Sequence, residues 1–114
     1  MPNVVRNKSF EFALAVIQLY QELQRQQEYI ISKQLLRCGT SIGANVEEAT
    51  AGQSRKDFLS KMAIASKEAR ETKYWLLLLQ QSNLTNVEVT SLLAQVDELI
   101  RILTSIVKTT SETP

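Results

Sequence analysis

The residues of this sequence with the greatest chemical potential are four glutamates and one cysteine. Glu47, Glu48, Glu68 and Glu71 fall on two segments with helical periodicity, and carboxylates alone could hold a hard cation. Basic residues occupy the same segments, however, so structural ion pairing is the simpler expectation. Cys38 lies on an apolar helical stripe, which is typical of a small core residue and not of a nucleophile.

Several common kinds of active site are excluded by residue type. The chain contains no histidine, which removes the usual general base and the commonest metal ligand. No base is therefore positioned to activate Cys38, and Gly39 and Gly43 do not match a phosphate-binding loop. We expect no enzymatic activity, no catalytic residues, no metal and no cofactor. A carboxylate-metal enzyme is the hypothesis that metal analysis of the purified protein would test.

A basic stripe is the strongest candidate for a binding site. At about 100° per residue, five cations of one predicted helix project within roughly 120° of one another, while acidic residues occupy another sector. Repeated around an oligomer, such a stripe could hold phosphates of RNA or DNA. The alternative is a solvated face with salt bridges between subunits. The candidate nucleic-acid-binding residues are Arg55, Lys56, Lys67, Arg70 and Lys73.

Charge and cysteine usage bound the partners and the compartment. The net charge of +1 gives no overall attraction to nucleic acid or to an anionic membrane, so any such partner needs a local patch. The lone Cys38 cannot form an intramolecular disulfide, and a reducing cytoplasm is the simplest compartment. The longest apolar run, Tyr74–Leu79, is too short to span a bilayer. We expect a cytoplasmic protein without a membrane segment.

Long helices must position these residues, because no proline occurs between Pro2 and Pro114. Apolar periodicity predicts helices at about residues 7–27, 32–50, 54–83 and 86–108, joined by short connections. The sequence therefore predicts one all-α domain, residues 1–114, folded as an antiparallel up-down-up-down four-helix bundle. Predicted N-terminal caps are Ser32, Ser54 with Asp57 three residues on, and a capping box of Thr85 and Glu88.

Two of the predicted helices carry more apolar surface than one bundle core needs. The first has two adjoining apolar stripes, and the third turns apolar on all sides near residues 75–79. This excess predicts self-association into a homo-oligomer, with a monomer of unusually wide core as the alternative. Gly39 and Gly43 in the second helix predict close approach of another helix, with a helix break near Gly39 as the rival interpretation. The two stripes of the first helix are Phe10, Ala13, Leu14, Ile17 and Tyr20, and Phe12, Val16, Leu19 and Leu23.

Two segments resemble a known bacterial family. Residues 35–49 read LLRCGTSIGANVEEA and residues 58–76 read FLSKMAIASKEARETKYWL. Both are similar to the signatures of the four-helix-bundle proteins related to the 23S ribosomal RNA intervening-sequence protein. The first signature is the more specific, since few helices carry Thr-Ser-Ile-Gly-Ala-Asn. The likeness covers nearly the whole chain in length and segment order.

The resemblance implies a homopentameric ring of such bundles. A related protein, the accessory variability determinant of diversity-generating retroelements, is a basic pentamer that binds nucleic acid. This sequence departs from that relative in being nearly neutral, and it has Cys38 where the family often has serine. Read with the signature, Arg37, Asn45 and Glu48 are expected to form a structural polar cluster whose partners lie on another helix or subunit.

Two functional hypotheses from different classes follow. The first is a non-enzymatic oligomeric bundle that binds RNA or DNA through a basic face of the ring. The second is a protein–protein adaptor that uses exposed apolar helix surface without binding nucleic acid. Failure to bind nucleic acid while a partner co-purifies would favour the second.

Overall fold

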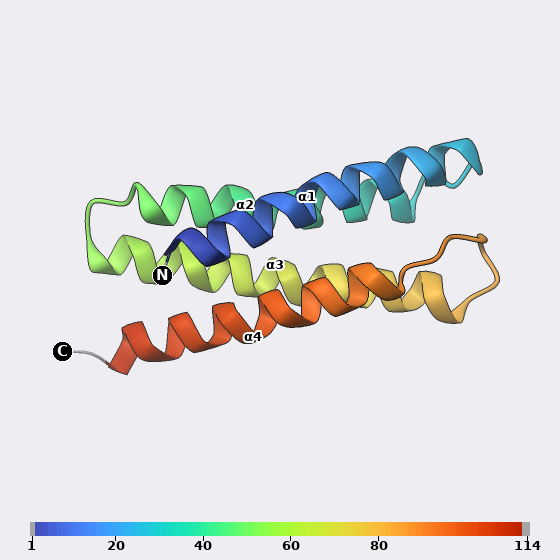
Figure 1. Cartoon of the computed structure of the whole chain (residues 1–114). Coiled ribbons are helices and arrows are strands. Elements are labelled where there is room, and N and C mark those ends of the chain that lie inside the picture. The colour runs from blue at the N-terminus through green and yellow to red at the C-terminus, as the bar shows by residue number, and fades with distance from the viewer. Residues whose placement is uncertain (1, 113–114) are drawn as a thin grey trace.

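Four long helices make up residues 2–112, the part of the chain that this computed structural model describes (Figure 1). They are α1 (Pro2–Arg25), α2 (Ile31–Thr50), α3 (Arg55–Gln81) and α4 (Thr90–Glu112). This range contains no strand, which confirms the expected all-α chain with four helices. Residues 1 and 113–114 of the expected domain lie outside the described range.

Each helix packs beside its neighbours in sequence, and α1 also packs beside α4. Short connections reverse the chain direction each time, so the start of α1 and the end of α4 lie at the same end of the rod (Figure 1). Helices α1 and α3 stand diagonally across the bundle, as do α2 and α4, with their backbones further apart than those of neighbouring helices. The result is an antiparallel rod of 49 × 21 × 20 Å.

One apolar line from each helix fills the centre of the rod. The second predicted stripe of α1 is buried, and the other helices contribute lines with the same helical spacing. The first predicted stripe of α1 is left mainly at the surface, so the excess of apolar surface on this helix is confirmed. The largest core side chains are Phe12, Leu23, Leu35, Ile42, Met62, Leu76, Leu99 and Leu103.

The two glycines of α2 lie where α1 comes closest. A Cβ at Gly39 would stand 2.8 Å from Val16 Cγ2, and one at Gly43 would stand 3.3 Å from the Ser9 carbonyl oxygen. Helix α2 runs unbroken through both positions. The predicted close approach is confirmed and the helix break near Gly39 is wrong.

The N-terminus of α2 is capped by Glu28 and not by Ser32. Gln27 lies just after the end of α1 and adopts a positive φ of 63°, which reverses the direction of the chain. The Glu28 carboxylate then accepts hydrogen bonds from the backbone N–H groups of Ile30, Ile31 and Ser32 at 3.0, 2.9 and 2.7 Å. Ser32 is buried inside the first turn, and its hydroxyl donates to the Glu28 carbonyl oxygen. The prediction of Ser32 as the cap was wrong because a longer side chain upstream reaches the same N–H groups.

The remaining helix ends agree with the sequence in part. The Ser54 hydroxyl accepts from the Asp57 N–H at 3.0 Å, which confirms that cap. The capping box of Thr85 and Glu88 is wrong, because α4 begins only at Thr90. There the Glu88 carboxylate accepts from the Thr90 N–H at 3.0 Å, and residues 85–89, which belong to no regular element, include a buried Val89.

Helix α1 begins earlier and helix α4 ends later than predicted, both at the same end of the rod. Helix α1 begins at Pro2, where a missing N–H costs nothing in a first turn, and Val5 is buried against the core. Helix α4 continues to Glu112, and Arg55 donates to the carbonyl oxygen of Thr110 near its end. Polar composition at residues 109–112 concealed this last turn from the sequence analysis. No helix of the described chain is long and apolar enough to cross a membrane.

Candidate nucleic-acid interface

Three of the five predicted phosphate contacts lie along the seam between α3 and α4. Arg55 and Lys73 are 18 residues apart, five helical turns, and so share one line on α3. The Arg55 guanidinium donates to the Thr110 carbonyl oxygen at 2.6 Å, and Lys73 pairs with Asp97 at 2.8 Å. Arg70 donates to the Thr104 hydroxyl at 3.0 Å. All three side chains therefore point toward α4.

The other two predicted contacts point further outward. Lys56 and Lys67 lie about 100° and 120° around α3 from the line of Arg55 and Lys73. Both are exposed, and neither forms an ion pair within residues 2–112. The five cations that the sequence grouped in one stripe thus divide into two sets with different surroundings.

Two cations of α4 extend the basic surface, and sequence reasoning missed them. Arg101 and Lys108 are exposed and lie two helical turns apart, close to the line of α4 that carries Asp97 and Thr104. The signal in the sequence is their spacing of seven residues, which places both on one line of a helix whose apolar pattern is the more prominent feature. We define the α3/α4 basic face as Arg55, Arg70, Lys73, Arg101 and Lys108.

Charge is strongly segregated in this molecule despite the small net value. The α3/α4 basic face holds five of the 13 cations, and two of the 12 carboxylates, Asp97 and Glu112, lie on the same side of α4. This face carries a net charge of +3, which leaves −2 for eight cations and ten carboxylates elsewhere. The basic side is therefore a local feature that the total charge of +1 conceals.

The predicted polar cluster of Arg37, Asn45 and Glu48 is not one hydrogen-bonded group in this chain. Arg37 pairs with Glu68 at 3.3 Å and also with Glu71, both on α3. Glu48 pairs with Lys61 of α3 at 2.9 Å.

Asn45 bonds within its own helix, since its amide donates to the Ser41 carbonyl oxygen at 2.9 Å. The partners of Arg37 and Glu48 therefore lie on another helix, as expected, and those of Asn45 do not. Arg37 and Glu48 therefore join α2 to α3 through separate ion pairs, and Asn45 bonds only within α2.

The candidate metal-binding glutamates are engaged in ion pairs. Glu47 forms a bidentate pair with Arg6 at 3.0 Å, which raises the pKa of that guanidinium. Glu71 also accepts from the Trp75 indole N–H at 3.1 Å. Within residues 2–112 no three His, Cys, Asp or Glu side chains are grouped to hold a metal ion. The expected pairing of these glutamates with basic residues is observed.

Cys38 has the surroundings of a packing residue. Cys38 belongs to α2, and its side chain is fully buried in the bundle. Burial raises the pKa of the thiol, although a hydrogen bond with Thr72 opposes this shift. The thiolate needed for nucleophilic chemistry is therefore disfavoured at neutral pH.

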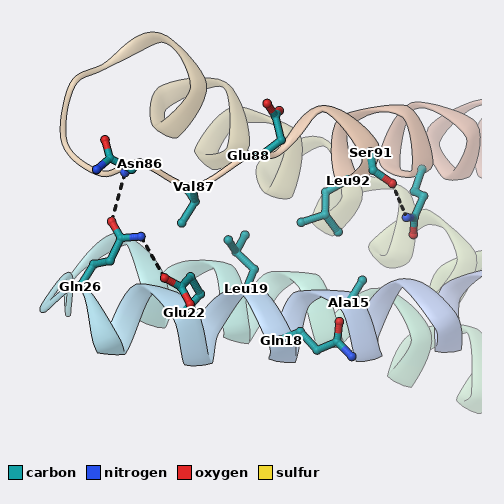
Figure 2. Close-up of a pocket in the computed structure, with 11 residues that line it drawn as sticks. Ala15, Gln18, Leu19, Glu22, Gln26, Asn86, Val87, Glu88, Ser91 and Leu92 are labelled. Atoms are coloured by element: carbon teal, nitrogen blue, oxygen red, sulfur yellow. Dashed lines mark hydrogen bonds between the residues drawn. The ribbon is translucent and has the colours of Figure 1, made fainter.

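A groove of ≈ 560 Å³ lies between α1 and the start of α4 (Figure 2). Its polar groups bond to one another: Gln26 accepts from the Asn86 N–H at 3.0 Å and donates to Glu22 at 3.0 Å. Hydrogen bonds from Gln26 and Arg25 lower the pKa of Glu22, and those from Thr90 lower the pKa of Glu88. Both carboxylates are ionised at neutral pH, so this groove does not suit a phosphate.

Comparison with known proteins identifies the family. The model of the 23S rRNA-intervening sequence protein family matches residues 2–105 of the chain. The chain belongs to this family. No curated protein matches the sequence.

A solved structure shows the same fold in a family relative. It is a protein of unknown function from the S23 ribosomal protein family of Bacteroides thetaiotaomicron, 48% identical in sequence. The similarity covers 94% of this chain and 97% of that one, with a TM-score of 0.86. The resemblance drawn from the two signatures is thereby confirmed, and no catalytic family is indicated for this 23S rRNA-intervening sequence protein family member.

Proposed function

We propose that this protein is a non-enzymatic, homo-oligomeric helical bundle that binds RNA or DNA through the α3/α4 basic face. The observation that carries the proposal is the segregation of a net +3 onto the α3/α4 basic face of a chain whose total charge is +1. Ion pairs hold five of the eight cations that lie outside this face, whereas Arg101 and Lys108 have no ionic partner among the described residues. Unpaired cations that are spaced along the rod attract the phosphates of a nucleic acid running in the same direction.

Contacts of this kind favour phosphate over base recognition. Arg101 and Lys108 stand about 10 Å apart along α4, and Arg70 lies across the seam from them. Arginine and lysine side chains on a convex helical surface neutralise backbone phosphates and position a duplex or strand without reading its bases. We therefore expect binding that depends steeply on salt and weakly on sequence.

Salt-dependent binding of labelled oligonucleotides tests the proposal. Fluorescence anisotropy would follow a short structured RNA and a DNA of equal length from about 50 to 200 mM salt. Replacing both α4 cations, R101A with K108A, is expected to weaken binding at low salt and to reduce the slope of log K against log[salt] by about 2 per protomer engaged.

The matched control removes the same charge from another surface. Arg25 and Lys33 are exposed and lie outside the basic face, so R25A with K33A should leave the slope unchanged. Equal losses in the two double variants would mean that only net charge matters, and absence of binding by the native protein at low salt would overturn the proposal.

A second candidate function is supported by a different surface. Phe10, Leu14 and Ile17 project from α1 into solvent, as a docking site for a partner helix would. A protein adaptor would retain a specific partner in the presence of nuclease and high salt. Loss of that partner in F10A, with no nucleic-acid binding by the native protein, would favour this alternative.

A further inference from the structure

Arg55, Arg70 and Lys73 bridge the seam between α3 and α4, and Arg70 differs from the other two in the charge of its partner. At one end of the seam Lys73 pairs with the Asp97 carboxylate. At the other end Arg55 donates to the carbonyl oxygen of Thr110, in the last turn of α4, where the helix dipole is negative. Each of these two cations is therefore balanced by a negative group of α4.

The bridge between them joins a cation to a neutral hydroxyl. Arg70 donates to Thr104 Oγ1 at 3.0 Å, and both residues are exposed. Arg70 forms no ion pair among residues 2–112, so its charge is not neutralised there. Its other guanidinium N–H groups remain available to a further acceptor.

The Thr104 hydroxyl also has a proton left to donate. The hydroxyls of three other helical threonines each donate to a carbonyl oxygen of their own helix, at 2.6, 2.9 and 2.8 Å; they are Thr40, Thr50 and Thr72. Within the described part of the chain Thr104 makes no such bond, although it accepts one from Arg70. An acceptor beside this bridge would thus receive hydrogen bonds from both the guanidinium and the hydroxyl.

Two further cations flank Thr104 on α4. Arg101 precedes it by three residues and Lys108 follows it by four, about 4.5 and 6 Å along the helix, and all three lie on one side of α4. Both cations are exposed and unpaired in the range 2–112. Lys67 lies one turn before Arg70 on α3, but about 60° further from α4. Three cations on two helices therefore surround one hydroxyl.

Most carboxylates near these cations are already paired. Two on α3 bind Arg37 of α2, and two on α4 bind lysines of α3 and α1. Glu112 lies one turn beyond Lys108, on the side away from Thr104. The middle of the seam thus keeps a positive charge that these groups do not cancel. The four paired carboxylates are Glu68, Glu71, Asp97 and Glu98.

We propose that the Arg70–Thr104 bridge binds one phosphate group of the nucleic acid. Arg70 holds two phosphate oxygens with its planar guanidinium, and the Thr104 hydroxyl donates to one of them. Arg101 and Lys108 add positive charge from one turn on either side. This inference rests on the proposed function and assigns one contact within it to named donors. Free inorganic phosphate presents the same oxygens, so the experiment must separate it from the phosphate of a strand.

A substitution that leaves the charge unchanged tests this site apart from the rest of the basic face. T104V removes the hydroxyl and keeps the shape of the side chain, and T104S retains a hydroxyl. In the anisotropy assay T104V should bind the oligonucleotides roughly fivefold to tenfold more weakly at each salt concentration, with an unchanged slope. T104S should bind within about twofold of the native protein. Because Thr104 is exposed, circular dichroism should show native helix content in both variants.

Removal of the arginine gives a second readout. R70A should weaken binding and also reduce the slope of log K against log[salt] by about 1 per protomer engaged. Adding T104V to R70A should cost less than about a further twofold, because both groups bind the same phosphate. The matched control T50V makes the same change on α2, diagonally across the bundle from α4, and should bind like the native protein.

Competition with inorganic phosphate separates the two sources of phosphate. At equal ionic strength, sodium phosphate should displace the oligonucleotide from the native protein more than sodium chloride does, and T104V should remove most of this difference. A T104V variant that loses the difference but binds the oligonucleotide like the native protein would mean that the site holds only free phosphate, against the proposal.

The variants also distinguish failure of this site from failure of the proposed function. Native affinity in both T104V and R70A, while R101A with K108A still weakens binding, would overturn the phosphate site and leave the proposed function intact. A native protein that binds no oligonucleotide at low salt would overturn both.

Discussion

The contact between Gly39 and Val16 gives a quantitative test of how α1 and α2 pack. In an isolated helix, G39A would be stabilising by about 1 kcal/mol, because alanine is the better helix former. In this chain the added methyl would stand 2.8 and 2.9 Å from the two Cγ atoms of Val16 and 3.3 Å from its Cβ. All of these distances are shorter than an ordinary carbon contact of about 3.5–4.0 Å.

Rotation of the valine cannot relieve this overlap. Val16 is fully buried, and its Cβ is itself too close to the new methyl. Overpacking of a filled core costs about 1–3 kcal/mol. Subtracting the propensity gain, we expect G39A to lower the free energy of unfolding by about 1 kcal/mol, against the direction that propensity alone predicts.

A double-mutant cycle separates overpacking from other causes. V16A alone removes buried methyl groups and should destabilise by about 2 kcal/mol. In G39A with V16A the new methyl occupies the vacated space, so the loss should be smaller than the sum of the single losses by at least about 1 kcal/mol.

Urea unfolding followed by fluorescence of the single tryptophan, Trp75, measures all four proteins at one concentration. A fixed concentration matters because self-association would add to the apparent stability. A more stable G39A, or strict additivity in the cycle, would refute the close-approach argument.

Three further predictions concern helix ends and the buried thiol. E28A removes the acceptor of three α2 N–H groups and should cost about 2 kcal/mol by urea unfolding; a loss below about 0.5 kcal/mol would contradict the capping role. The lowered pKa of Glu88 means that its contribution is present above the unfolded pKa of about 4.3 and lost as pH falls through the folded value, so E88Q should flatten the acid side of the stability curve between about pH 5 and 3. An acid limb as steep as that of the native protein would count against this. Cys38 should resist iodoacetamide at pH 8 in the native state and react at once in urea, and rapid native labelling would show that the thiol is accessible.

The fold could be predicted from the sequence because the apolar periodicity extends along each whole helix and does not depend on any single residue. Apolar residues recurring every three or four positions across 20 or more residues define a helix whatever its ends do. Close approach at Gly39 and Gly43 could also be inferred, since glycine in a helix interior costs stability unless a neighbour needs the space. The helices and the close approach could both be predicted because each rests on residue types within one helix, and the packing of the helices agrees with them.

Helix ends were less predictable, because several side chains compete for the same N–H groups. Ser32 has the residue type of a cap, but Glu28 reaches three N–H groups after Gln27 reverses the chain. Thr85 and Glu88 have the spacing of a capping box, yet no helix forms until the chain has passed the buried Val89. Which candidate wins depends on the path of the connection, and spacing alone does not contain that path.

The candidate site was only half visible in the sequence because it spans two helices. A helical wheel of α3 groups its cations by angle, but it cannot say that Lys73 meets Asp97 whereas Lys67 meets solvent. Nor can it add Arg101 and Lys108, which join the surface only when α4 packs alongside. The division of the stripe into a seam and an outward set is a tertiary property.

Helix α3 explains why a single basic stripe was an incomplete description. One of its sides enters the core at Met62 and Leu76, and a second meets α2 through Glu68 and Glu71. A third side meets α4 with the cations of the seam, and the fourth faces outward with Lys67 and Tyr74. Lys67 therefore stands apart from the seam, and its loss is expected to weaken nucleic-acid binding less than loss of Arg101 and Lys108 does. Affinities of K67A and of R101A with K108A, measured over the same range of salt, separate the two surfaces. Equal losses would show that the outward side binds phosphate as well.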